Sequence, residues 1–319
     1  MSGDICIVSA AASEETLPAS MWSFGGGKGG VGKSLIATTV AYWLGRTGHR
    51  VVLVDADLGG ANLHTLLGIR VPRLTLEDFL LHRAATLGEV LLSTPFENVR
   101  LLAGGFDVTS LANPNYGQKT RLLRALRRLS ADYILVDLGA GTSLNVLDFF
   151  LACPNRCVVL SPQPTSVQNA YGFIKSALYR QMARLASRNP EALALLNEPN
   201  GAGRAVQTVP QLATAISAAA PPIADELSLV LAAFRVQLVV NMVRAPHEEQ
   251  TAQVVQGVCK RYLGIDADLL GVVPFDQAIQ RWVSTIDPGC FMQAGLEGAR
   301  RATHDIADTL IAPTLARAA

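Results

Sequence analysis

The chain has 319 residues, half of them apolar and 17% charged, with a formal net charge of +1. This composition is typical of a compact globular protein and excludes a disordered chain. The near-neutral charge gives no overall attraction to nucleic acid or to anionic membrane, so such partners need a local patch. The five cysteines are too few and too scattered for a secreted disulfide framework, which favours a reducing compartment.

The first 20 residues are predicted to form an N-terminal extension. They include Asp4, Glu14 and Glu15 and lack the basic and apolar regions of a signal peptide. No apolar run in the chain approaches the roughly 18 residues that indicate a membrane span. We therefore expect a cytoplasmic protein.

Residues 21–315 are predicted to form a single α/β domain, because short apolar runs alternate with longer stretches of helical periodicity. This alternation predicts three layers, with a mostly parallel, twisted sheet of seven or eight strands covered by helices on both faces. The predicted strands cover residues 22–24, 51–55, 99–103, 133–137, 157–160, 236–241 and 269–273. The predicted helices cover residues 33–47, 74–82, 118–129, 145–152, 165–188, 248–263, 275–284 and 291–311.

Residues 189–233 interrupt this alternation with five prolines in a Gly- and Ala-rich segment. We interpret the segment as a helical insertion with two short helices, because it is too small and too weakly apolar to have its own core. A lid or a peripheral subdomain is the expected role.

A phosphate-binding loop is predicted between the first strand and the first helix. The pattern Gly27-x4-Gly32-Lys33-Ser34 has the required strand before it and helix after it. Backbone N–H groups of such a loop surround phosphate oxygens, and the positive end of the helix dipole adds to the attraction. Lys33 is expected to reach the β and γ phosphates, and Ser34 to bind Mg²⁺. The predicted contacts are Gly27, Lys28, Gly29, Gly30, Val31, Gly32, Lys33, Ser34 and Leu35.

Two further strands end in acidic residues. Asp55 and Asp57 end one strand and share a side of it, and Asp137 ends another. The carboxyl ends of the strands are where α/β sheets bind ligands, so these acids are expected near the phosphate loop. The alternative is that Asp55 or Asp57 caps the following helix.

A second lysine in the loop makes the pattern more specific. The string Lys28-Gly29-Gly30-Val31-Gly32-Lys33-Ser34 resembles the deviant Walker A motif of the MinD/ParA family of P-loop NTPases. The resemblance implies ATP and Mg²⁺ as cofactors and a homodimer in the ATP-bound state. It also implies that Lys28 reaches the phosphates of the partner subunit, with Lys28, Lys33 and Asp57 as the catalytic residues. The alternative for Lys28 is a solvated cation.

The same resemblance assigns roles to the acidic strand ends. Asp55 would support the Mg²⁺ shell, Asp137 would bind Mg²⁺ through water, and Asp57 would orient the attacking water. Gly139 and Gly141 would belong to a switch II loop that responds to the γ-phosphate. Asn241, Pro274 and Asp276 stand where the family holds adenine, although Asn241 has the alternative of an ordinary turn residue.

The resemblance is closest to FlhG-like and MinD-like members and implies a slow ATPase that acts as a switch on an unidentified protein target. Flagellar number or placement, cell division and chromosome partitioning are the expected settings. The alternative function is a metal-cluster carrier ATPase similar to Mrp or the nitrogenase iron protein. The spacing of Cys153 and Cys157 argues against a cluster and favours buried structural thiols.

Several features depart from the family pattern. Gln163 and Asn169 stand where members usually have acids, so either the dimer contacts or the nucleotide discrimination near this helix is expected to differ. The C-terminal stretch from residue 295 lacks Phe and Trp, so we expect a helix that packs on the core and no clear membrane anchor. Arg121, Arg124 and Arg128 share one helix face, which could contact DNA, a partner protein or only solvent.

Overall fold

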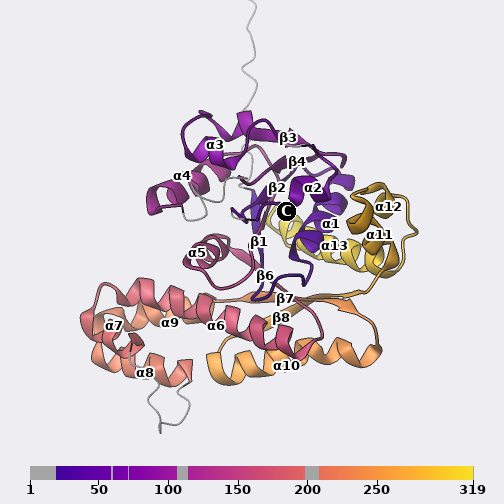
Figure 1. Ribbon diagram of the computed structural model, residues 1–319. Helices are drawn as coiled ribbons and strands as arrows, with labels where there is room; N and C mark the ends of the chain where they lie inside the picture. The colour runs from indigo at the N-terminus through magenta and orange to yellow at the C-terminus, as the bar shows by residue number, and fades with distance from the viewer. Residues whose placement is uncertain (1–18, 59, 71, 106–113, 198–207, 319) are drawn as a thin grey trace, which may run out of the picture.

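An eight-stranded sheet forms the centre of the computed structural model, which describes residues 19–58, 60–70, 72–105, 114–197 and 208–318 (Figure 1). The strand order is β3-β4-β2-β5-β1-β6-β7-β8, and every neighbouring pair is parallel except β3 and β4. The strands are β1 (Ser20–Gly25), β2 (Val51–Asp55), β3 (Leu91–Ser93), β4 (Val99–Leu102), β5 (Tyr133–Asp137), β6 (Asn155–Leu160), β7 (Val236–Val243) and β8 (Ala267–Pro274).

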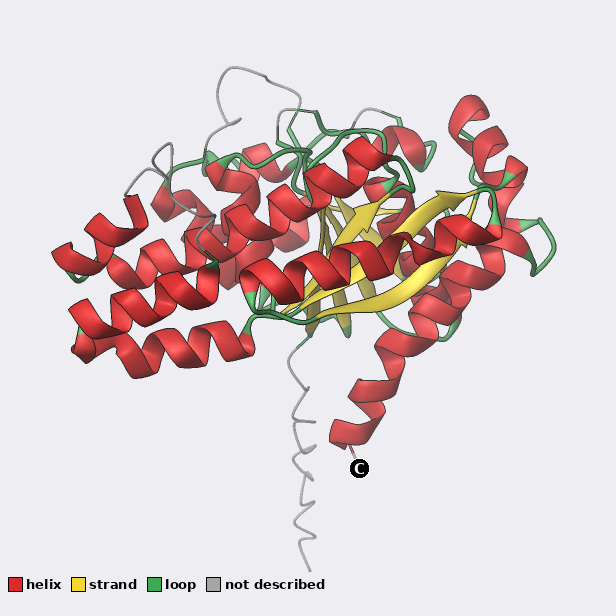
Figure 2. Ribbon diagram, turned by 90° about the horizontal axis from the view of Figure 1, so that it is seen from below, coloured by secondary structure: helices red, strands yellow, loops and turns green. Residues whose placement is uncertain are grey.

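Helices cover both faces of this sheet (Figure 2). One face is covered by α3 (Leu76–Leu80), α4 (Tyr116–Leu126), α5 (Leu144–Ala152), α6 (Pro164–Ala186) and α10 (Thr251–Val258). The other face is covered by α1 (Lys33–Arg46), α2 (Leu63–Leu66), α11 (Gln277–Thr285), α12 (Gly289–Met292) and α13 (Gly298–Ala318). The predicted three-layer α/β fold is therefore confirmed.

Alternating side chains of the strands separate the interior into two cores. In β2, Val52 and Val54 belong to the core under α3 to α6, whereas Val51 and Leu53 belong to the core under α1 and α13. Successive residues of a strand point to opposite faces, so a strand that is apolar throughout must be covered on both sides. This is why near-continuous Val, Ile and Leu runs predicted these strands correctly.

The sheet has one strand that the sequence analysis missed. β3 pairs antiparallel with β4 through Leu91, Leu92 and Ser93, so the two strands form a hairpin at this edge of the sheet. A three-residue strand is too short to show an alternating pattern, and the connection contains no Asn-Gly signal.

The predicted helix over residues 291–311 is wrong, because the chain forms α12 and α13 instead. The break lies around Gly295, and α13 begins where the Asp276 carboxylate accepts a hydrogen bond from the Ala299 backbone N–H at 3.1 Å. The prediction that the terminal helix packs on the core is confirmed for the side chains that the structure describes. Ile306, Ala307 and Leu310 of α13 are buried in the core shared with α1.

The insertion contains α7 (Pro190–Asn197), α8 (Val209–Ala219) and α9 (Ala224–Ala233), one helix more than predicted. These helices extend from the end of α6 (Figure 1). Within the described residues, the insertion shares a buried cluster with the sheet, to which Val209, Leu212, Ile216 and Leu227 belong. Most of the predicted N-terminal extension and residues 198–207 lie outside the described residues, but Ser20 already belongs to β1. Among the helices that the structure describes, none is long and apolar enough to cross a membrane.

Candidate functional site

The predicted phosphate loop connects β1 to α1 at the carboxyl edge of the sheet. Gly32 directly precedes the helix with a φ of 91°, a left-handed conformation that glycine adopts without strain. α1 then begins at Lys33, and its first backbone N–H groups have no partner within the helix. The Leu35 side chain is buried, so only the backbone of this predicted contact can face a ligand. The loop thus has the backbone geometry of an anion site.

The phosphate loop is held from three sides by residues distant in sequence. Gly27 lies so close to α6 that a Cβ there would be 2.2 Å from the Asn169 backbone oxygen. The Asn241 side-chain Nδ2 donates a hydrogen bond to the Val31 backbone oxygen at 2.9 Å. The Gly141 backbone N–H donates to the Gly26 backbone oxygen at 3.3 Å. The loop is therefore preformed by its surroundings.

The predicted acidic residues meet beside this loop. Asp55 and Asp137 are paired positions at the ends of β2 and β5, and both are buried. Asp137 accepts a hydrogen bond from the Ser34 hydroxyl, and the charges of Asp137 and Asp57 both act on the buried Lys33 ammonium. Asp57 also lies against the backbone of Gly139. The fold therefore brings together Lys33, Ser34 and three carboxylates, as the sequence predicted.

Burial dominates the titration of these groups. Removal from water, with a smaller contribution from the neighbouring Asp55 charge, raises the pKa of Asp137 to about 8, although Ser34 and Lys33 oppose the shift. Burial likewise raises the pKa of Asp55 to about 6, although backbone N–H donors oppose the shift. The pKa of Lys33 is lowered by burial, against the attraction of Asp137 and Asp57. The site therefore holds more negative charge than its single buried lysine offsets.

The same residues fit a magnesium ion. Asp137 Oδ1 is buried and accepts no hydrogen bond from the described part of the chain, which is costly for a carboxylate oxygen. Carboxylate and hydroxyl oxygens are the ligands that Mg²⁺ prefers, and a dication would offset the charge of these acids. Ser34 and Asp137 are thus the residues that would hold Mg²⁺.

Asp55 has a second, structural task. Its Oδ2 accepts hydrogen bonds from the backbone N–H groups of Asn62 at 2.9 Å and Leu63 at 3.0 Å, at the start of α2. The capping alternative therefore describes Asp55, and its support of the Mg²⁺ shell stays a prediction. Asp57 makes no such contact with α2 in the structure, and its carboxylate faces the site.

Lys28 points away from the Lys33 side of the loop. Its Nζ lies 3.4 Å from Gln163 Oε1 and 3.2 Å from Thr165 Oγ1, at the beginning of α6. The residue is partly exposed, and its side chain makes no hydrogen bond or ion pair with Asp55, Asp57 or Asp137 in the structure. Its predicted reach to a partner subunit stays a prediction.

Two of the residues predicted to hold adenine already make side-chain hydrogen bonds within the protein. Asn241 holds Val31 through one N–H of its side-chain amide, which leaves its second N–H and its oxygen for a ligand. Both oxygens of Asp276 accept hydrogen bonds from backbone N–H groups, namely Ala278 at 2.7 Å and Ala299 at 3.1 Å. The backbone from Pro274 to Asp276 is therefore the better candidate for base contacts, which stay a prediction.

Two other features carry less weight. Cys153 and Cys157 lie in different cores, and burial raises the pKa of the Cys153 thiol to about 12. Thiols placed in this way are structural and do not share a metal.

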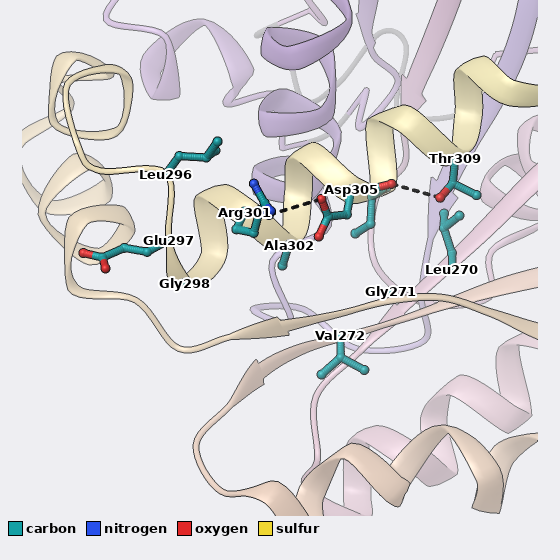
Figure 3. A pocket seen from close by; sticks show the side chains of 11 residues that line it. Leu270, Gly271, Val272, Leu296, Glu297, Gly298, Arg301, Ala302, Asp305 and Thr309 are labelled. Carbon is teal, nitrogen blue, oxygen red and sulfur yellow. Dashed lines mark hydrogen bonds and ion pairs between the residues drawn. The ribbon is translucent and has the colours of Figure 1, made fainter.

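A cavity of about 640 Å³ lies between β8 and α13, where Leu270, Arg301 and Asp305 line it (Figure 3). No predicted site residue lines this cavity.

A sequence profile of the family described as the CobQ/CobB/MinD/ParA nucleotide binding domain matches residues 22–288. This range includes the phosphate loop and the two strand ends that carry Asp55, Asp57 and Asp137. The chain belongs to this nucleotide-binding family. The antiactivator FleN of Pseudomonas aeruginosa is 30% identical over 262 residues, which are 81% of this chain and 74% of FleN.

Other members of the CobQ/CobB/MinD/ParA family are also similar. The flagellum site-determining protein YlxH of Helicobacter pylori is 32% identical over 156 residues, which are 47% of this chain and 50% of YlxH. The structure of septum site-determining protein MinD from Pyrococcus horikoshii, complexed with Mg-ADP, has a TM-score of 0.62 and 21% identity. That match covers 92% of this chain and 96% of the other, and it shows a shared fold.

Two supports of the phosphate loop are not predictable from the sequence. Asn241 is predicted to contact adenine, but its observed contact is with Val31, 210 positions away in the sequence. Asn169 departs from the family pattern in its charge, but in the structure its backbone oxygen packs against Gly27. No local pattern signals either contact, because each depends on the order of strands in the sheet.

Proposed function

We propose that this chain is an ATPase that works as a dimerisation switch, with ATP and Mg²⁺ as cofactors and slow hydrolysis that resets the dimer. The observation that carries the proposal is the convergence of Lys33, Ser34, Asp57 and Asp137 beside a preformed phosphate loop. Family membership supports nucleotide binding, because relatives with the same domain include a MinD complexed with Mg-ADP.

Each residue would have a distinct task in this reaction. Loop N–H groups and Lys33 would hold the β and γ phosphates, and bound Mg²⁺ would neutralise charge that develops on them. Asp57 would orient the attacking water, which requires position more than basicity. It is suited to this because it lies beside Gly139 and within reach of the Lys33 charge.

The two lysines of the loop would divide the work between subunits. Lys33 is buried and faces its own site, whereas Lys28 is at the surface on the α6 side. A surface lysine on a phosphate loop offsets phosphate charge most when a second ATP-loaded subunit approaches it, much as an arginine finger does. Dimerisation would then report the presence of ATP.

The cellular setting we propose is the placement or number of flagella, with cell division and chromosome partitioning as alternatives. The support is similarity over most of the chain to the antiactivator FleN, together with the shorter match to YlxH. The target would be a protein that recognises the ATP-bound dimer. The metal-cluster carrier alternative gains no support from the buried, separated Cys153 and Cys157.

The switch is tested by sizing the protein with and without Mg-ATP in analytical ultracentrifugation. Asp57→Ala should bind ATP, lose hydrolysis by at least about 100-fold and accumulate as a dimer. Lys28→Ala should keep its ATP affinity but remain a monomer. Lys260→Ala is the matched control, because Lys260 pairs with Asp266 on the surface and lies outside the phosphate loop.

The outcome that contradicts the switch is a Lys28→Ala protein that dimerises and hydrolyses ATP like the unsubstituted chain. If both variants behave as expected, the trapped Asp57→Ala dimer becomes the bait for identifying the protein target by pull-down.

A further inference from the structure

The position of Lys28 in the single chain has a specific chemical setting. Its ammonium group rests between the side-chain oxygens of Gln163 and Thr165, at 3.4 Å and 3.2 Å. Gln163 is the N-cap of α6, and Thr165 lies in the first turn of that helix. Both acceptors are neutral. Within the described part of the chain, no carboxylate pairs with Lys28.

This setting holds the lysine weakly. The N-terminus of an α-helix carries a partial positive charge, so a cation placed there is repelled. α6 has 23 residues, and no acidic residue in its first turn offsets this repulsion. Hydrogen bonds on the surface compete with water and contribute little. Lys28 is therefore docked by contacts that a stronger anion can replace.

The backbone beneath Lys28 is fixed, in contrast to its side chain. Gly27 is packed against the Asn169 backbone oxygen, and Gly26 accepts a hydrogen bond from the Gly141 backbone N–H. The hydrogen bond from the Asn241 side chain to the Val31 backbone oxygen also holds the loop backbone in place. Release of Lys28 therefore requires only rotation of its side chain, with no rearrangement of the phosphate loop.

We propose that Gln163 and Thr165 are positioning residues that hold Lys28 at rest in the monomer, and that the neutrality of Gln163 sets how readily ATP drives dimerisation. The proposal rests on the proposed dimerisation switch. Phosphates of a second ATP-loaded copy carry several negative charges and take the lysine from two neutral oxygens. A carboxylate at position 163 would compete for it.

The charge of residue 163 provides the test. Gln163→Glu places an anion at the same atoms, where both the lysine and the helix N-terminus attract it. Each dimer must then break two such ion pairs. We expect ATP-dependent dimerisation in the Asp57→Ala background to need roughly tenfold more protein, as measured by sedimentation.

Gln168→Glu is the matched control, because it adds the same charge to an exposed position of α6 with no contact to Lys28. It should leave dimerisation unchanged. Adding Lys28→Ala to Gln163→Glu removes the expected interaction, so Gln163→Glu should then have no further effect. The proposal is overturned if the Gln163→Glu variant dimerises as readily as the protein that keeps Gln163. It is also overturned if Gln168→Glu weakens dimerisation as much as Gln163→Glu does.

A second readout separates this proposal from the switch itself. In the nucleotide-free monomer, the rate at which an amine reagent acylates Lys28 is measured by peptide mass spectrometry. Gln163→Glu should slow acylation severalfold, and Thr165→Val should accelerate it. If the unsubstituted chain fails to dimerise with ATP, the proposed function fails, and the acylation rates still decide whether this hold on Lys28 exists. Unchanged acylation in both variants overturns it.

Discussion

The pKa shifts of single residues in the site are caused by burial more than by the charges of their neighbours. Asp137 ends a strand between two cores, and one of its oxygens has no hydrogen-bond partner among the residues that the structure describes. The folded protein therefore favours the protonated acid until a cation arrives. Mg²⁺ binding requires the ionised carboxylate, so metal affinity should increase as the pH rises toward 8.

The raised pKa of Asp137 gives a pH-dependent stability in the protein without nucleotide and metal. Its folded pKa of about 8 exceeds the ordinary value of 3.8, so the unfolding free energy falls as the pH rises between these values. Asp55 adds to this loss up to a pH of about 6. We expect urea unfolding to give a value lower by more than about 1 kcal/mol at pH 8 than at pH 5.5.

Asp137→Asn should remove most of this difference, because the amide does not ionise. The exposed Asp305→Asn is the control and should preserve it. A pH dependence unaltered by Asp137→Asn would show that another group causes it. The same Asp137→Asn variant should lose Mg²⁺-dependent hydrolysis.

Among the secondary-structure elements, two helices depend on one side chain. Asp276 accepts hydrogen bonds from Ala278 and Ile279 at the start of α11 and from Ala299 at the start of α13. The predicted helix over residues 275–284 begins two residues too early, because Asp276 is the N-cap that precedes α11. A single carboxylate thus fixes where α11 begins and how the terminal helix restarts.

Asp276→Ala should lower the unfolding free energy by about 1–2 kcal/mol, since it removes caps from two helices. Urea unfolding measures this loss, with the exposed Asp268→Ala of β8 as the control. If the backbone holds the base, loss of the carboxylate should change ATP affinity by less than about threefold, which corresponds to less than about 1 kcal/mol. Lost affinity with unchanged stability would instead make the carboxylate a direct contact.

In the whole molecule, the described helices of the insertion share a buried apolar cluster with the sheet. Leu212 and Ile216 of α8 are buried in the cluster that also contains Val158 and Phe173. A shared apolar core couples the free energies of the elements that build it. We therefore predict that the insertion unfolds together with the sheet, even though its composition sets it apart in the sequence.

Leu212→Ala should destabilise the entire domain by about 2–5 kcal/mol, because it leaves a cavity in the common core. Thermal unfolding should keep a single transition with a lower midpoint. The control is Leu229→Ala in α9, whose side chain is 70% exposed and should cost little. Two separate transitions in Leu212→Ala would show that the insertion unfolds independently.

The sequence by itself determined seven of the eight strands, the phosphate loop and the acidic strand ends, because local periodicity and short spacings encode them. Only the tertiary structure decided that Asn241 braces Val31, that Lys28 rests on Gln163 and Thr165, and that Asp276 caps two helices. The first two contacts join residues separated by more than 130 positions. Such pairs meet because β6 and β7 follow β1 in the order of the sheet. No local pattern encodes this order.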